Sequence, residues 1–385
     1  MKKVGFWGTL YAVSVLLISA GLALGTGSGP SSSAGDYKLL APISHGDLTI
    51  FPVVTARSHD TSGFITLDEG TRSGEVVVSE MGNLHGFMRR RSTQPIYSRG
   101  PEVNRLVLVN NSRHPLILLA GEVVTGGRQD RVVGKDRIVP AESDPVDLAV
   151  FCVEPGRWVE KSVNFDTHAS VMAQPSVRKR AMVDADQRKV WDEVNSAKAN
   201  MTARLAEGAG TRGGSGGGVA GGMIAVAPSS AEMVELESTS SYAGAIENSA
   251  VKQQVDSITA PVEKSYESVI KQLRNQNAIG VVVAVRGRIV WADLFASNAL
   301  LSKYWPKLLQ SYAAEALSSN SSRADVSMKD AEKFLDDWSA RHETADSEPG
   351  LYRQRELVGD NFRAFELTSL LPKESFDVHL SKMAE

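Results

Sequence analysis

The sequence predicts an α+β fold in which an antiparallel β sandwich or barrel-like layer packs against helices. Short apolar runs separated by turn residues follow one another from residue 48 to residue 154, a spacing typical of antiparallel strands. Apolar residues then recur with a helical period in the segments 176–201, 231–277, 301–312 and 326–342. Strand-like pairs at 279–295 and 352–367 complete the pattern, and each turns at a glycine.

The elements follow from local chemistry. The first strand is expected at 48–56, where Pro52 indicates an edge position or a bulge. Thr66 can cap a short helix within 64–74, and Ser297 can cap a later one. Pro261 predicts a break in the helix at 231–277. The remaining early strands are expected at 75–79, 102–110, 115–124, 131–139 and 145–154.

The strands before and after the glycine-rich segment are expected to form one unit. Residues 206–230 include the sequence GAGTRGGSGGGVAGG, which is a low-complexity loop insertion. Since a lone hairpin is only marginally stable, the hairpin at 279–295 needs the earlier strands. We therefore expect a single α+β domain over 45–372, followed by a C-terminal tail at 373–385.

The N-terminus carries an export signal or a membrane anchor. Lys2 and Lys3 precede an uncharged stretch at 4–24, which fits either a signal peptide within 1–25 or one membrane-spanning helix. Residues 26–44 begin with a flexible Gly/Ser tether. Both alternatives place the domain outside the cytoplasm, either periplasmic or extracellular or anchored to the membrane through residues 4–24.

Charge and composition narrow the classes of partner. A formal net charge of -3 gives no reason to expect a nucleic-acid partner, because proteins that bind nucleic acid usually carry a basic face. The seven histidines are scattered and nominate no metal site, and no motif nominates a cofactor. Cys152 is the only cysteine, which excludes an intramolecular disulfide. Because it lies in an apolar run, Cys152 is expected to be a buried core residue.

Polar side chains concentrate in the segment 116–158, at the ends of predicted strands. In an antiparallel meander such strand ends can converge in space. Carboxylates beside guanidinium groups can orient a polar ligand, and a carboxylate pair can perform acid–base catalysis if one pKa is raised. The candidate residues are Glu122, Gln129, Asp130, Arg131, Glu154 and Arg157.

Three interpretations of this cluster remain open. An ion-pair network that fixes strand register is favoured, a binding site comes second, and a catalytic site third. The corresponding functions are an extracytoplasmic binding or interaction domain for an unknown small molecule or protein, or a hydrolase that uses Glu122 or Glu154 as general base. A hydrolase would act on an ADP-ribose-like or other phosphorylated substrate.

Four ordered blocks carry a resemblance to a known family. They are Gly121-Glu122 with Gly127-Arg128-Gln129-Asp130-Arg131, then Cys152 to Trp158, then Trp191 to Val194, then Asp293 to Phe295 with Trp305 to Ala313. The chain resembles the bacterial family named for its association with ADP-ribosylglycohydrolases and rhodanese-phosphatases. The resemblance implies genomic association with ADP-ribose metabolism, and the glycine-rich insertion and the export signal depart from the family pattern.

Overall fold

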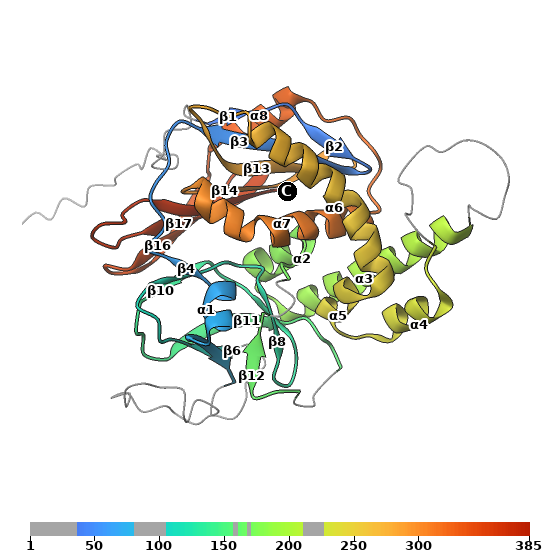
Figure 1. Cartoon of the computed structure of the whole chain (residues 1–385), viewed down its shortest axis with the longest axis horizontal. Helices are drawn as coiled ribbons and strands as arrows, with labels where there is room; N and C mark the ends of the chain where they lie inside the picture. Colours follow the sequence, from blue (N-terminus) through green and yellow to red (C-terminus); the bar gives the residue numbers. More distant parts are fainter. Residues whose placement is uncertain (1–36, 81–104, 157–160, 168–170, 211–226) are drawn as a thin grey trace, which may run out of the picture.

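The computed structural model describes residues 37–80, 105–156, 161–167, 171–210 and 227–385. The expected α+β class is confirmed, with a closed barrel, a larger antiparallel sheet and helices packed on both. Figure 1 shows the barrel strands, in teal and green, below the long helices α6 and α7 and the sheet. The expected segment at 4–24 lies outside the described residues. No helix within the described ranges is long and apolar enough to cross a membrane.

The large sheet joins both ends of the chain. Its strand order is β1-β3-β13-β14-β18-β17-β16-β15, and β2 also pairs with β3. β3 and β13 pair over their whole lengths, although more than 200 residues separate them in the sequence. The strands are β1 (Lys38–Leu39), β2 (Ile43–His45), β3 (Leu48–Thr55), β13 (Asn277–Val285), β14 (Arg288–Phe295), β15 (His342–Glu348), β16 (Tyr352–Val358), β17 (Phe362–Ser369) and β18 (Asp377–Ala384).

The barrel is inserted between β3 and the first long helix. Six strands close it in the order β11-β6-β5-β12-β8-β9, and a small sheet, β10-β7-β4, lies beside it. Their bounds are β4 (Ile65–Thr66), β5 (Val76–Ser79), β6 (Arg105–Asn110), β7 (Leu116–Leu118), β8 (Val123–Gly126), β9 (Arg131–Val133), β10 (Arg137–Val139), β11 (Val146–Cys152) and β12 (Asn164–Asp166). The short strands fit the short apolar runs of the sequence.

The helices cover the sheet and the side of the barrel. They are α1 (Leu67–Ser73), α2 (Pro175–Lys179), a π-helical turn (Arg180–Asp184), α3 (Gln187–Gly210), α4 (Ser230–Ser238), α5 (Tyr242–Glu247), α6 (Ser249–Ile270), α7 (Asn298–Ser318) and α8 (Met328–Asp336). The predicted caps are confirmed, since Thr66 accepts a hydrogen bond from the backbone N–H of Glu69 and Ser297 accepts one from Leu300.

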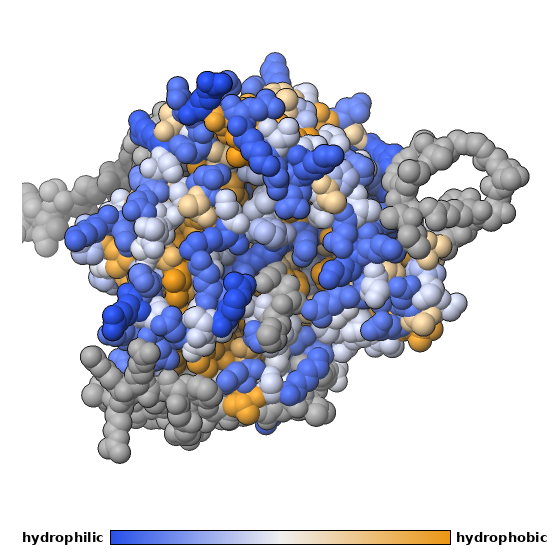
Figure 2. Space-filling view, viewed as in Figure 1, coloured by the Kyte–Doolittle hydropathy of each residue, from blue (hydrophilic) through white to orange (hydrophobic). Residues whose placement is uncertain are grey.

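Separate apolar cores hold these layers together. The largest lies between the sheet and helices α6 and α7, a second lies between the sheet and α8, and a third fills the barrel. A fourth joins the barrel to α2 and α3. On the face shown in Figure 2 hydrophilic side chains predominate, with smaller areas of hydrophobic side chains between them.

Three local predictions need correction. The tail expected at 373–385 contains β18, which pairs with β14 and β17 in the sheet interior. The helix α6 does not break at Pro261, because the proline lies on the exposed face of a helix whose other side is buried. Pro52 lies in β3, which is an inner strand of the sheet. On one side of β3 the short strands β1 and β2 pair with residues after and before Pro52, so no strand hydrogen bond is lost there through its missing N–H.

Candidate functional site

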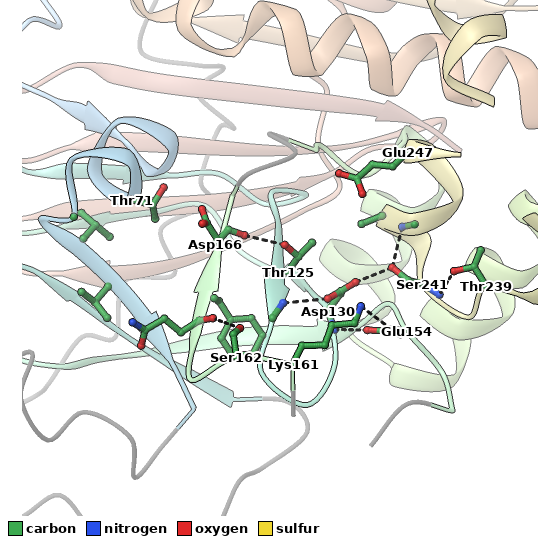
Figure 3. Close-up of a pocket in the computed structure, with 18 residues that line it drawn as sticks. Thr71, Thr125, Asp130, Glu154, Lys161, Ser162, Asp166, Thr239, Ser241 and Glu247 are labelled. Carbon is green, nitrogen blue, oxygen red and sulfur yellow. Dashed lines mark hydrogen bonds and ion pairs between the residues drawn. The ribbon is translucent and has the colours of Figure 1, made fainter. Parts of the chain in front are cut away.

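A cavity of about 740 Å³ lies between the barrel and the N-terminal end of α5. It is in the size range of small-molecule sites. Figure 3 shows Asp130, Glu154, Lys161 and Ser241 lying close together in a wall that also contains the apolar side chains Val76, Val77, Phe165 and Ala243. The polar and charged side chains of the wall, these four included, come from the barrel strands, the loops, α1 and α5. They are the carboxylates Asp130, Glu154, Asp166 and Glu247, the hydroxyls Thr71, Thr125, Ser162, Thr239 and Ser241, the amide Asn164 and the ammonium of Lys161.

Asp130 ties the barrel to the helix. One carboxylate oxygen accepts a hydrogen bond from the backbone N–H of Gly126 at 3.1 Å, and the other accepts one from the Ser241 hydroxyl at 2.7 Å. Ser241 is also the N-cap of α5 and accepts a hydrogen bond from Gly244 N–H at 2.9 Å. Burial raises the pKa of Asp130, the Ser241 hydroxyl opposes this, and the charge of Glu154 adds to the rise.

Glu154 stands beside Asp130 because of strand pairing. β11 pairs with β9 so that Cys152 lies opposite Arg131, which brings the residues after one strand to the residues before the other. The Glu154 carboxylate accepts a hydrogen bond from Asp130 N–H at 3.0 Å and lies 3.6 Å from the ammonium of Lys161. The two carboxylates therefore line one wall of the cavity (Figure 3).

Gln129 and Arg131 support this wall from within the barrel. The Gln129 amide donates to the Glu154 carbonyl at 3.2 Å, and the Arg131 guanidinium donates to the Gln129 carbonyl at 2.6 Å. Both side chains are buried and neither lines the cavity. The predicted convergence thus brings four of the six candidates together, two as wall and two as support. Arg157 lies outside the described residues.

Glu122 lies away from this cavity, in an ion pair with a helix. Its carboxylate lies 2.5 Å from the Lys307 ammonium on α7 and accepts a hydrogen bond from Leu119 N–H at 2.7 Å. Lys307 also binds the carboxylate of Asp68 on α1 at 2.8 Å. Burial raises the pKa of Glu122, whereas Lys307 lowers it. Because Glu122 is paired and buried, its arrangement matches the structural interpretation of this residue.

A second buried network was missed by the sequence reasoning. His379 on β18 lies 2.7 Å from the Asp136 carboxylate through Nδ1 and 3.1 Å from that of Asp293 through Nε2. Arg178 on α2 donates to both oxygens of Asp293 at 2.9 and 3.2 Å, and the Tyr312 hydroxyl on α7 donates to it at 2.5 Å. Asp136 belongs to the segment after β9, so the network links the barrel to the sheet and helices.

Burial and charge pairing set the protonation states in this network. Burial lowers the pKa of His379, but the carboxylates of Asp136 and Asp293 outweigh it and raise the pKa to about 9. Burial raises the pKa of Asp293, but the Arg178 guanidinium and His379 outweigh it and hold the pKa far below its usual range. The network is therefore a set of paired ions at neutral pH, in which each charge depends on its partners.

Gly121 is required beside this network. Its φ is +95°, and a Cβ at this position would lie 2.5 Å from Cγ and 2.7 Å from Cδ of Arg178. The Arg178 side chain is fully buried and is held by Asp293, so it cannot move aside easily. Gly121 and Glu122, adjacent in the sequence, thus contact two different ionic groups that fasten the barrel to α2 and α7.

Residues 36–383 match the model of the ARPP-1 domain, the ARG and Rhodanese-Phosphatase-superfamily-associated Protein domain. The chain belongs to this family. The suspected resemblance is confirmed, and the match includes β18, which the predicted domain boundary omitted. No curated protein and no solved structure matches the chain.

The sequence blocks that carry the resemblance have two different roles in the structure. Gly121, Glu122, Asp293, Lys307 and Tyr312 belong to the buried ionic groups, whereas the segment after β8 and the one after β11 build the cavity wall. Cys152 is fully buried, as predicted, and burial raises the pKa of its thiol, which disfavours a nucleophilic thiolate. Among the described residues, no group of three or more histidine, cysteine or carboxylate side chains is arranged to hold a metal ion.

Proposed function

We propose that the chain is an extracytoplasmic binding domain whose barrel cavity takes a small, hydroxyl-rich molecule that is neutral or positively charged. The observation that carries this proposal is the composition of the cavity wall. Its described lining residues include four carboxylates, five hydroxyls and one amide, against a single ammonium group. Carboxylates and hydroxyls are hydrogen-bond partners for sugar hydroxyls and amines, and several carboxylates in one cavity repel an anion.

The rigid support of the wall favours binding over a purely structural role. Asp130 is fixed by Gly126 and Ser241, and Glu154 is fixed by the Asp130 backbone and faces Lys161. A ligand therefore meets polar groups that are already oriented, which lowers the entropic cost of binding. The extracytoplasmic location is part of the proposal and rests on the lysines and the apolar stretch at 4–24.

A matched series of sugars tests the ligand class. We expect calorimetry on the full-length chain to show binding of glucosamine and glucose and much weaker binding of glucose 6-phosphate. Glu154→Gln should weaken glucosamine binding about tenfold or more, because hydrogen bonds to charged groups contribute about 1.5–3 kcal/mol. Glu263→Gln, an exposed carboxylate on α6, is the matched control. Preference for the phosphate would refute the proposed ligand class.

A second candidate function is hydrolysis at the same cavity. The observation that favours it is a pair of carboxylates, Asp130 and Glu154, of which Asp130 has a raised pKa. Such a pair can supply a general acid and a general base. Of the two general bases considered from the sequence, Glu154 lines the cavity and Glu122 does not.

Turnover of ADP-ribose, followed by chromatography of the products, tests this second candidate. We expect Glu154→Gln to abolish turnover, and Glu122→Gln to retain turnover in proportion to its folded fraction. No turnover by the wild-type chain, or equal turnover by Glu154→Gln, would exclude hydrolysis of this substrate by Glu154.

A further inference from the structure

A second cavity, of about 320 Å³, lies at one end of the large sheet and differs in chemistry from the barrel cavity. The ends of β3, β13, β14 and β18 meet there, and the segments around residues 57–59 and 375–377 close its sides. None of its lining residues lines the barrel cavity. It is lined by Tyr37, Thr55, Arg57, His59, Ile279, Leu294, Phe295, Ala296, Ser375, Phe376, Asp377, His379 and Leu380.

The floor of this cavity is apolar. Ile279, Leu294, Phe295 and Leu380 are buried core side chains that turn part of their surface toward the cavity. Phe295 is itself held between two rings, stacking on Tyr304 with centroids 5.5 Å apart and tilting against His379 at 4.7 Å. A floor of fixed apolar side chains favours a ligand with an apolar face, because burial of that face is favourable and needs no rearrangement.

The walls of the cavity are aromatic. His59 and Phe376 stack with centroids 4.5 Å apart and an interplanar angle of 17°, and Phe64 supports Phe376 edge-on at 6.3 Å. Backbone hydrogen bonds fix both segments, since His59 N–H donates to Ala296 at 2.9 Å and Ser369 N–H donates to the Phe376 carbonyl at 2.9 Å. The backbone at both rings is therefore anchored to the sheet, and the two rings contact each other.

Arg57 and Tyr37 stand at the rim. A guanidinium group is planar and stacks on aromatic rings even while it pairs with a carboxylate, and a tyrosine ring adds a further flat surface. Aromatic rings prefer stacked or edge-to-face contact with other rings, so this combination discriminates in favour of flat ligands. We propose that the sheet-end cavity, between the His59–Phe376 pair and the floor at Phe295 and Leu380, binds a small planar aromatic molecule.

Calorimetry on the full-length chain with 2-naphthol and with decahydro-2-naphthol tests this proposal. The two compounds have the same skeleton and hydroxyl group, and only the first is planar and aromatic. We expect 2-naphthol to bind and its saturated analogue to bind at least about fivefold more weakly, in line with the strength of aromatic pairs. Equal binding of the two, or no binding of 2-naphthol, would overturn the proposal.

Two variants place the binding in this cavity. Phe376→Leu keeps an apolar side chain and removes the ring, and it should weaken 2-naphthol binding about fivefold. Ser375→Trp fills the cavity from an exposed position and should abolish binding without unfolding the chain. Phe151→Leu, on the barrel, is the matched control and should bind as the wild type does. Should Phe376→Leu fail to fold, Ser375→Trp decides alone, and unchanged binding by it would refute the proposed site.

Discussion

Replacing Gly121 with alanine adds only one methyl group but should strongly destabilise the protein. A positive φ costs a non-glycine residue about 1–2 kcal/mol. The added Cβ would also lie 2.5 Å from Cγ of Arg178, whose guanidinium is bound by both oxygens of Asp293. Overpacking of this kind costs about 1–3 kcal/mol. We therefore expect Gly121→Ala to lower the free energy of unfolding by about 2–5 kcal/mol.

Gly350→Ala is the matched control for this effect. Gly350 also has a positive φ, +75°, but no atom lies within 4 Å of the position that a Cβ would take. Gly350→Ala should therefore lower the free energy of unfolding only by the cost of the positive φ, about 1–2 kcal/mol. Urea unfolding followed by tryptophan fluorescence gives both values. Equal losses of stability in the two variants would refute the conclusion that the Arg178 side chain needs a glycine at position 121 beside it.

Further predictions concern the ionic groups and the cap of α5. Lys307→Met should destabilise the protein by about 3–5 kcal/mol, because it leaves the Glu122 carboxylate buried without its cation. The double variant Lys307→Met/Glu122→Gln should lose less stability than the sum of the two single variants. Additive losses in denaturant unfolding would contradict the ion pair between Glu122 and Lys307. For His379, whose pKa rises from 6.5 to about 9 on folding, the stabilisation is complete below pH 6.5 and is lost as the pH rises through 9. Between pH 6 and pH 10 the unfolding free energy of the wild type should therefore fall by about 3 kcal/mol relative to that of His379→Gln, while Lys382, whose pKa is lowered to about 7 and which acts in the opposite direction, contributes to both chains. An identical pH profile for the two chains would refute the charge assignment. Ser241→Ala should lower the free energy of unfolding by about 1–2 kcal/mol and weaken glucosamine binding, because it removes the cap of α5 and the hydrogen bond to Asp130. Ser229→Ala, at the exposed cap of α4, should leave glucosamine binding unchanged. Equal effects of the two variants on binding would contradict the role of the hydrogen bond between Ser241 and Asp130.

The sequence predicts those parts of the site that depend on neighbouring strands. Asp130 precedes β9 and Glu154 follows β11, and both strands are short apolar runs in the sequence, so their convergence could be expected from antiparallel pairing. Local chemistry likewise predicts the caps at Thr66 and Ser297, because a cap depends on residues three positions away.

The sequence does not predict the partners that come from distant elements. Lys307 lies 185 residues from Glu122, and no local pattern distinguishes it from an ordinary exposed lysine of a helix. The sequence predicts a tail at 373–385, whereas His379 lies in β18, a buried strand of the large sheet that also carries Ser381 and Lys382. Its place became evident only when the sheet provided Asp293 and the barrel provided Asp136 as partners.

Pro261 shows the same dependence on tertiary contacts. The sequence predicted a break, because a proline in a helix interior removes a hydrogen bond. In the structure α6 packs Ile258 and Val262 against the large core while Pro261 faces solvent, and this packing maintains the helix through the proline.

Glu154 is proposed to contact the ligand in the barrel cavity, whereas Glu122 stabilises the fold through its ion pair with Lys307. Measuring glucosamine affinity and the free energy of unfolding for Glu154→Gln and Glu122→Gln, side by side, tests this distinction most directly. We predict that Glu154→Gln loses affinity about tenfold or more, and that Glu122→Gln loses about 1–3 kcal/mol of stability but binds as the wild type does at a temperature where it is folded. Loss of affinity in Glu122→Gln, with unchanged affinity in Glu154→Gln, would contradict the account.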